Sequence, residues 1–259
     1  MRRISVDIGG TFTDCFVVWD GQYIEAKALT THHNLALGFN EALEKANKVL
    51  GLELETILSE VDSVRYATTL GTNALIEHKG PKIGMLVTAG FEATVPLSRA
   101  RGYGDGLDSL AQQDMPNAQR PAPLVAAHMI YGVRERMDFQ GKLVMPLDEE
   151  DVRRQIRSLV NRGAQIIVVA LVNSVVNPLH EQRIEEILFE EYPSHLLGAI
   201  PVILSHQVAG RKGEYVRATS AVVDGYLHST MYHALSALEQ NLRAHKYNKP
   251  MLVIHNSGG

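Results

Sequence analysis

The chain has 259 residues, of which 45% are hydrophobic and 21% charged, so it can bury one sizeable core or two modest ones. Its formal net charge of -4 supplies no basic field for nucleic acid or an anionic membrane, and no apolar run approaches the roughly 18 residues that cross a bilayer. The single cysteine, Cys15, excludes an internal disulfide and fits a reducing compartment. We therefore expect a cytoplasmic protein with neither nucleic acid nor a membrane as partner.

The first 28 residues predict an antiparallel meander. Short strands are expected at 3 to 8, 14 to 19 and 22 to 28, and Asp20-Gly21 between the last two is a favoured two-residue hairpin turn. Cys15 falls inside the second strand, so we interpret it as a packing residue and not as a nucleophile.

The rest of the chain alternates between helices and strands, as in an α/β fold. Apolar residues recurring every three or four positions predict helices at 35 to 50, 73 to 79, 148 to 163, after the cap Asn177-Pro178, and at 213 to 246, where Gly225 allows a bend. Apolar and β-branched runs predict strands at 64 to 69, 82 to 88, 165 to 172, 201 to 205 and 251 to 255. Glycine, proline and polar residues predict a loop or lid at 102 to 123.

The stretch from Asp7 to Asp14, Asp-Ile-Gly-Gly-Thr-Phe-Thr-Asp, lies between the first two strands and carries the chemistry. Polyphosphate needs several backbone amides that converge on it, and Gly9 and Gly10 let the main chain turn tightly and approach closely. Thr11 and Thr13 add hydroxyl donors without charge. The spacing is neither that of a Walker loop nor that of a dinucleotide fingerprint, because a strand follows where a helix would begin.

Two acids flank this loop and are our catalytic candidates. Asp7 is placed to hold, through water, the Mg²⁺ that accompanies ATP, and Asp14 either keeps the loop in shape or shares the water shell of the metal. Phe12 belongs to the same expected nucleotide-binding set. The alternative interpretation is that the glycine pair only forms a hairpin turn.

A second group of polar residues follows the strand at 64 to 69. Thr68, Thr69, Thr72 and Asn73 lie where that strand runs into a helix. They are expected either to face the nucleotide or the substrate, or simply to cap the helix.

The residues from Asp7 to Asp14 resemble the phosphate loop of the ATP-dependent hydantoinase, 5-oxoprolinase and acetone/acetophenone carboxylase family, which shares the fold of actin, sugar kinases and heat-shock ATPases. Further family motifs are matched along the chain at Thr68-Thr69-Leu70-Gly71-Thr72-Asn73-Ala74-Leu75, Thr88-Ala89-Gly90-Phe91, Asn177-Pro178-Leu179-His180-Glu181, 214 to 220 and Asn256-Ser257-Gly258-Gly259. The chain departs from the family at His78, Ala93 and 208 to 213, which bears on substrate contacts more than on nucleotide binding.

The resemblance implies an actin-like (ribonuclease H-like) α/β lobe with a three-strand meander and a mixed sheet flanked by helices. Residues 1–175 would form the N-terminal lobe with the first phosphate loop, and residues 176–259 would begin a second, hydantoinase A-type region that is apparently truncated. ATP and Mg²⁺ are the implied cofactors, with Gly258 and Gly259 as further nucleotide contacts. In the family, a second phosphate loop and the adenosine pocket lie beyond the position of Gly259.

The function that this resemblance implies is ATP-dependent phosphorylation of a cyclic amide, such as hydantoin, 5-oxoproline or a lactam, before ring-opening hydrolysis. A subunit of a ketone carboxylase of the acetone or acetophenone type is the alternative, and the residues do not separate the two. A non-catalytic accessory subunit with the same fold and a small-molecule kinase or nucleotide sensor are further alternatives, the last disfavoured by the full motif. A second large subunit is the expected protein partner.

Overall fold

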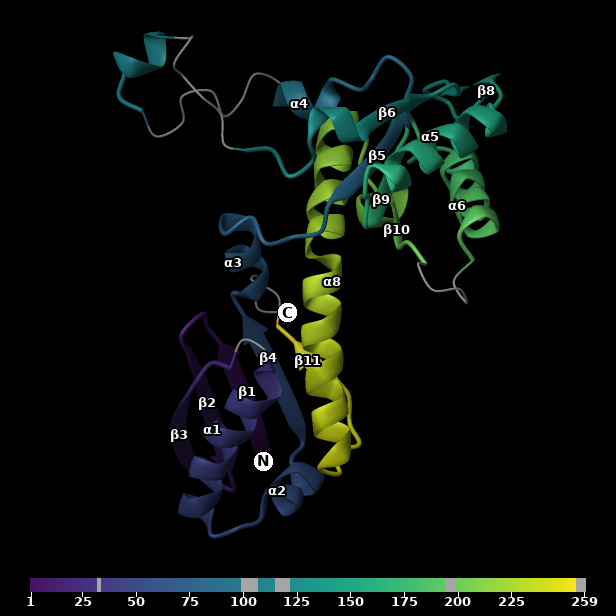
Figure 1. Cartoon of the computed structure of the whole chain (residues 1–259). Helices are drawn as coiled ribbons and strands as arrows, with labels where there is room; N and C mark the ends of the chain where they lie inside the picture. The colour runs from purple at the N-terminus through teal and green to yellow at the C-terminus, as the bar shows by residue number, and fades with distance from the viewer. Residues whose placement is uncertain (32–33, 99–106, 115–121, 194–198, 255–259) are drawn as a thin grey trace. The chain divides into compact units, whose positions relative to one another are not determined.

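The computed structural model describes residues 1–31, 34–98, 107–114, 122–193 and 199–254, and it divides into two compact units (Figure 1). The first unit is Met1–Lys79 with His228–Gly259, and the second is Gly80–Leu227. Helix α8 (Glu214–Ala244) supplies residues to both units. The boundary expected near residue 175 lies between two regions that the family resemblance implies. The division into compact units does not test it, so it stays a prediction.

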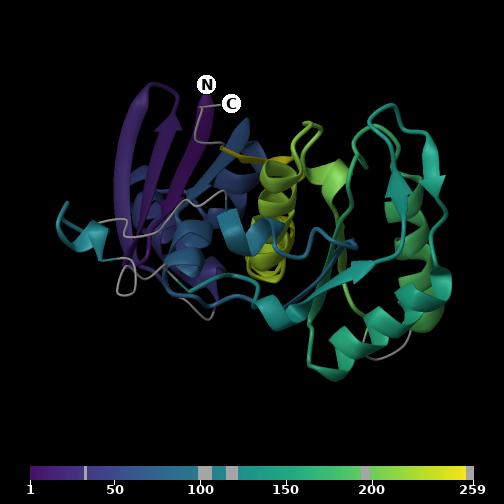
Figure 2. The same ribbon diagram turned by 90° about the horizontal axis from the view of Figure 1, so that it is seen from above.

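The first unit is built on a mixed five-stranded sheet with the order β11-β4-β1-β2-β3. Strands β1 (Arg2–Ile8), β2 (Phe12–Trp19) and β3 (Gln22–Leu29) form the predicted antiparallel meander, which is purple in Figures 1 and 2. On the other side of β1, strands β4 (Ser63–Thr68) and β11 (Met251–Val253) are added in parallel. This order confirms the expected ribonuclease H-like fold.

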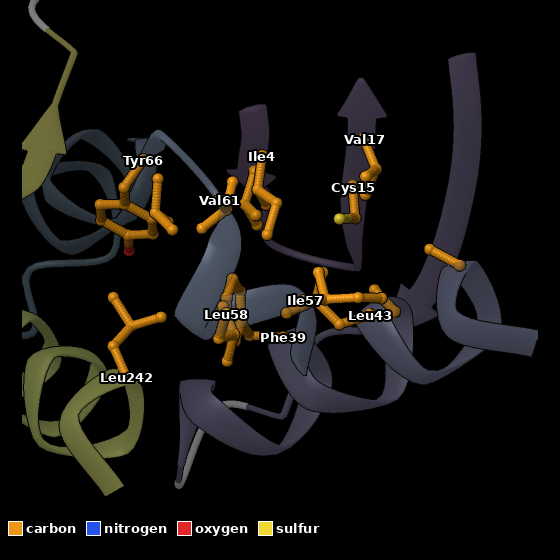
Figure 3. Packing of buried hydrophobic residues seen from close by; sticks show 14 of the residues in the cluster. Ile4, Cys15, Val17, Phe39, Leu43, Ile57, Leu58, Val61, Tyr66 and Leu242 are labelled. Atoms are coloured by element: carbon orange, nitrogen blue, oxygen red, sulfur yellow. The ribbon is translucent and has the colours of Figure 1, made fainter. Parts of the chain in front are cut away.

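One face of this sheet carries the core of the first unit (Figure 3). Alternate residues such as Ile4, Cys15 and Val17 point from the strands towards helices α1 (Leu35–Leu50) and α2 (Leu54–Glu60), and Leu242 of α8 joins the same cluster. Cys15 is only 2% exposed, which confirms that it is a packing residue. Its burial raises the pKa of the thiol to about 12, because the thiolate would lose its hydration.

The second unit is built on a parallel sheet with the order β10-β9-β5-β6. Its strands are β5 (Ile83–Thr88), β6 (Ile130–Val133), β9 (Ile166–Ala170) and β10 (Val202–Leu204). Helices α5 (Glu149–Asn161) and α6 (Leu179–Glu191) pack against it, together with the first part of α8. An added Cβ at Gly225 would lie 3.0 Å from Val168 Cγ2 of β9, so this glycine permits α8 to pack closely against β9. Helix α8 is continuous through Gly225, where the sequence allowed a bend.

Several short elements were not predicted from the sequence. They are α2, α4 (Thr94–Leu97), α7 (Ser205–Val208), two 3-10 turns at Ala111–Gln113 and Ala127–Met129, strand β6, and a two-stranded ladder of β7 (Arg136–Met137) and β8 (Leu143–Met145). The predicted loop at 102 to 123 contains the first of these turns, and its residues 102–106 and 115–121 lie outside the described residues. Among the residues that are described, no helix is both long and apolar enough to span a bilayer.

The matched motif from Asn177 to Glu181 holds the second unit together. Asn177 Oδ1 accepts from the Leu179 amide at 3.1 Å, and Pro178 occupies the cap position of α6. Glu181 is fully buried, and its carboxylate accepts from the amide of Leu171 at 2.9 Å, from Ser205 Oγ at 2.6 Å and from the amide of His206 at 3.1 Å. The motif therefore fastens α6 to the ends of β9 and β10.

Glu214 and Arg217, three residues apart on α8, have a structural role in the second unit. Arg217 is 1% exposed, lies 3.6 Å from the carboxylate of Glu214, and donates from Nη2 to the carbonyl of Leu171 at 2.7 Å. The first turn of α8 is thereby tied to the end of β9.

Candidate functional site

The loop that joins β1 to β2 is held closed by a hydrogen bond from the Gly9 amide to the Phe12 carbonyl at 3.0 Å. Neither Gly9 nor Gly10 adopts a left-handed backbone conformation, so the reason for glycine is space. An added Cβ would lie 3.2 Å from Phe12 O at Gly9 and 3.0 Å from Asn73 Nδ2 at Gly10. A larger residue at Gly9 would push the loop open, and a larger residue at Gly10 would push Asn73 aside.

The amides at the tip of this loop have the character of an anion site. Gly10 and Thr11 are exposed, and within the part of the chain that the structure describes their amides donate to no other group. Unpaired backbone amides that lie next to each other attract phosphate oxygens. Phe12 beside them is 43% exposed, and the Lys27 ammonium lies 4.6 Å from the centre of its ring.

Thr13, which the sequence placed among the nucleotide contacts, lies behind the loop. It is fully buried, and its hydroxyl lies 3.1 Å from the hydroxyl of Thr30. Its side chain therefore has a partner inside the first unit.

The two acids that flank the loop face each other. Asp7 of β1 and Asp14 of β2 are directly paired in the antiparallel ladder, and both are exposed on the sheet face opposite the core. Asp14 Oδ1 lies 2.9 Å from Lys27 Nζ, with both side chains 55% exposed. Like charges that are directly opposed destabilise a strand pair, so a cation between them would be favourable.

These two carboxylates fit a hydrated magnesium ion. Mg²⁺ binds through one or two protein carboxylates and completes its six ligands with water and substrate phosphates. Across the described residues, no group of three or more histidine, cysteine, aspartate or glutamate side chains could hold a metal ion. Asp7 and Asp14 thus offer two carboxylates, the number of protein ligands that a hydrated Mg²⁺ uses and fewer than an all-protein cage needs.

On the core side of the loop, the first unit contains an open cavity of about 350 Å³. Residues lining it include Gly9, Gly10, Thr30, Asn73, Glu77 and Lys79. Asp7 and Asp14 point to the other face of the sheet and are not among the lining residues. The loop therefore separates a pair of carboxylates from a cavity that is large enough for a small molecule.

The second group of predicted residues lies on α3 (Leu70–Ile76). Asn73 faces the cavity, and its Nδ2 lies 3.5 Å from Thr69 Oγ1. Thr69 occupies the cap position of α3 but makes no capping side-chain bond to a described residue; Thr68 Oγ1 accepts from the Leu70 amide instead, at 3.0 Å. Thr72 is exposed on the same helix.

The sequence analysis missed some of the residues around the loop and could not place others. Gly258 and Gly259 lie outside the described residues. Thr30, Glu77 and Lys79 were missed, because their nearness to the glycine loop arises from pairing between segments far apart in the chain. The sequence carries no local pattern that would have identified these contacts.

A ribonuclease H-like sheet with a glycine loop between its first two strands is the architecture of an actin-like lobe. The chain belongs to the hydantoinase/oxoprolinase family: residues 3–192 match the model of the hydantoinase/oxoprolinase N-terminal region.

Curated relatives include subunits of carboxylases and of a caprolactamase. The chain is 43% identical over 259 residues to the acetophenone carboxylase gamma subunit of Aromatoleum aromaticum, covering 100% of this chain and 35% of that protein. It is 30% identical over 258 residues to the acetone carboxylase beta subunit of Xanthobacter autotrophicus, covering 98% and 36%. It is 29% identical over 259 residues to the caprolactamase subunit alpha of Pseudomonas jessenii, covering 99% and 36%. The chain thus spans about a third of the length of these relatives.

Two solved structures share the fold closely. The nucleotide-free acetone carboxylase structure superposes with a TM-score of 0.89 at 29% identity, covering 98% of this chain and 36% of that one. The ATP-dependent caprolactamase of Pseudomonas jessenii superposes with a TM-score of 0.84 at 28% identity, covering 97% and 35%. Both likenesses confirm the expected α/β fold, a mixed sheet with helices packed on it.

Proposed function

We propose that this chain is the nucleotide-binding lobe of an ATP-dependent enzyme that activates a carbonyl-derived oxygen of its substrate by phosphorylation. The observation that carries this proposal is the loop tip, where the exposed amides of Gly10 and Thr11 lie beside the opposed carboxylates of Asp7 and Asp14. Amides on one side and a metal-binding acid pair on the other are the two elements that a nucleotide's polyphosphate needs.

The loop residues act by position and charge. The amides of Gly10 and Thr11 would donate hydrogen bonds to phosphate oxygens and stabilise the negative charge that spreads over those oxygens during transfer. Asp7 would hold the magnesium through water, and Asp14, already beside Lys27, would orient the same water shell. Bound Mg²⁺ would supply charge neutralisation of the polyphosphate.

Phosphorylation would make a poor leaving group into a good one. In the cyclic-amide reaction, the amide oxygen would take the terminal phosphoryl group of ATP and ADP would leave; water would then add to the activated carbon, inorganic phosphate would depart, and cleavage of the C–N bond would open the ring. In the ketone reaction, the α-carbon would lose a proton, the enolate oxygen would take the phosphoryl group, and the enol carbon would bond to carbon dioxide as water releases inorganic phosphate and restores the ketone. The same lobe serves both reactions, because the nucleotide side of the chemistry is identical.

The 43% identity to an acetophenone carboxylase subunit, against 29% to a caprolactamase subunit, favours the ketone reaction over the cyclic amide that we first expected. The relatives are subunits of larger enzymes, so we propose a second, different large subunit as partner. A cytoplasmic location remains our expectation from the single cysteine and its buried, unpaired thiol.

The test is nucleotide-dependent phosphate release by the enzyme as isolated with its partner subunits. It is screened with hydantoin, 5-oxoproline and caprolactam, and with acetophenone or acetone plus bicarbonate. We expect ketone-dependent release that Asp7→Ala abolishes while circular dichroism shows an unchanged fold. Release that depends on a cyclic amide would transfer the assignment to the amidase reaction. Release that is unaffected by Asp7→Ala would contradict the proposed site.

A further inference from the structure

The two carbonyl groups on either side of the Gly9 α-carbon are each held by a threonine from a different strand. The carbonyl of Ile8 accepts from Thr68 Oγ1 at 2.9 Å, and the carbonyl of Gly9 accepts from Thr30 Oγ1, also at 2.9 Å. Thr68 is the last residue of β4, and Thr30 directly follows β3. The glycine loop is therefore braced from both sides of the meander.

The hydrogen bonds from Thr68 and Thr30 orient different backbone donors, because the C=O and N–H of one trans peptide point in opposite directions. The described peptide bonds include no cis bond. The Ile8 carbonyl shares its peptide with the Gly9 amide, which already donates to Phe12 O at 3.0 Å. The Gly9 carbonyl shares its peptide with the Gly10 amide, which donates to no group that the structure describes. Thr30 therefore fixes the direction of an available donor, whereas Thr68 fixes the direction of a satisfied one.

Behind Thr30 lies a second threonine that orients it. Because the Thr30 hydroxyl gives its proton to Gly9 O, its oxygen is left to accept from Thr13 Oγ1, 3.1 Å away. Thr13 is fully buried, and Gly38 of α1 packs closely over it, since an added Cβ there would lie 3.3 Å from Thr13 Oγ1 and 2.7 Å from Leu29 O. The hydroxyl chain Thr13 to Thr30 to Gly9 is thus anchored in the core of the first unit.

The main chain of Thr30 holds the same loop a second time. Its amide donates to the Thr11 carbonyl at 2.9 Å, so Thr30 contacts the loop before and after Gly10. A glycine peptide rotates more freely than any other, because no Cβ restricts it. Without these contacts, the Gly9–Gly10 peptide would sample orientations that turn the Gly10 amide away from a ligand.

We propose that Thr30 is a positioning residue of the phosphate loop: supported by Thr13, its hydroxyl holds the Gly9–Gly10 peptide so that the Gly10 amide faces a phosphate oxygen. The inference rests on the proposed function and names a residue that the glycine motif does not contain. A donor that is oriented before binding avoids the reorientation that weakens binding, which is the advantage of a preorganised site.

The test compares three variants of the isolated enzyme with its partner subunits. Thr30→Val removes the hydroxyl and keeps the shape of the side chain, Thr30→Ser restores the hydroxyl, and Thr68→Val removes the matched hydroxyl from the other brace. Magnesium tripolyphosphate is the probe, because it contacts the phosphate site without needing an adenosine pocket. Its affinity is measured by titration calorimetry, and the melting temperature of each variant is measured alongside.

We expect Thr30→Val to weaken tripolyphosphate binding by about tenfold or more, the scale expected for one misdirected backbone donor. Thr30→Ser should stay within about twofold of the original protein, and Thr68→Val should lower the melting temperature with an affinity change below about twofold. Unchanged binding in Thr30→Val, or equal losses in Thr30→Val and Thr68→Val, would overturn the positioning role alone. If the original protein binds no tripolyphosphate, the proposed function fails and this inference fails with it.

Discussion

Replacing Asp7 by asparagine should separate the stability of the first unit from its function. Asp7 and Asp14 are directly paired across β1 and β2, and both are exposed. Side chains so paired have Cβ atoms about 5 Å apart, where two unit charges in water repel by on the order of 0.8 kcal/mol. Lys27, 2.9 Å from Asp14, offsets part of this repulsion. We therefore expect Asp7→Asn to raise the free energy of unfolding in metal-free buffer by about 0 to 0.5 kcal/mol.

The same substitution should remove the stabilisation that magnesium nucleotide gives. A ligand present at about 100 times its dissociation constant raises the free energy of unfolding by about 2.7 kcal/mol if it binds only the folded state. We expect a gain of that kind in the original protein and almost none in Asp7→Asn.

Urea denaturation monitored by tryptophan fluorescence measures both quantities. Trp19 is the single tryptophan, lies at the end of β2 and is 8% exposed, so its emission reports unfolding of the sheet that carries the two acids. Glu25→Gln is the matched control, because Glu25 is exposed on β3 opposite Phe16 and faces no acid. A loss of more than about 1 kcal/mol in metal-free buffer, or full nucleotide stabilisation in Asp7→Asn, would refute the reasoning.

Three further substitutions test the packing and the backbone. Glu181→Ala would leave the Leu171 amide and other buried donors without an acceptor, so we expect unfolding monitored by circular dichroism to lose about 3–5 kcal/mol; a loss below about 1 kcal/mol would contradict this role. The raised pKa of Cys15, about 12, exceeds the value of about 8.5 in an unfolded chain, so between these pH values the folded state binds one more proton and stability falls by about 1.4 kcal/mol per pH unit. Cys15→Ala should lack that part of the alkaline decline in urea titrations, and an identical decline would argue against a buried neutral thiol. His78 is exposed and has a φ of 52°, so His78→Gly should raise the free energy of unfolding by about 1 kcal/mol in thermal melts, and a lowered melting temperature would contradict backbone strain at this position.

The sequence predicted the parts of the fold that depend on local pattern. Alternating residues and the Asp20-Gly21 turn located the meander, and the spacing of Leu35, Phe39 and Leu43 located α1. Helix α2 was not predicted, and α3 was expected three residues too late, because helices of seven residues show too few turns of an apolar pattern. Strands β7 and β8, of two and three residues, are too short for a period of two to appear, whereas the three-residue strands β10 and β11 were located by apolar runs.

The candidate site was predictable in its location but not in its hydrogen bonds. The run of glycines and threonines identified the loop, but its chemistry depends on which way each hydroxyl points. Thr13 was expected to face a ligand, and its alternation with Cys15 on the core side of β2 turns it towards Thr30 instead. Thr30 reaches Gly9 only because β3 returns beside β2. A contact between such distant positions produces no recognisable sequence pattern in either segment.

The most direct test of the account is a crystal structure of the isolated enzyme with ATP and Mn²⁺, whose anomalous scattering locates the metal in the place of Mg²⁺. We predict the metal beside Asp7, bound through water, with phosphate oxygens within hydrogen-bond distance of the Gly10 and Thr11 amides. A metal and a triphosphate located elsewhere, with this loop closed against its neighbours, would contradict the central claim.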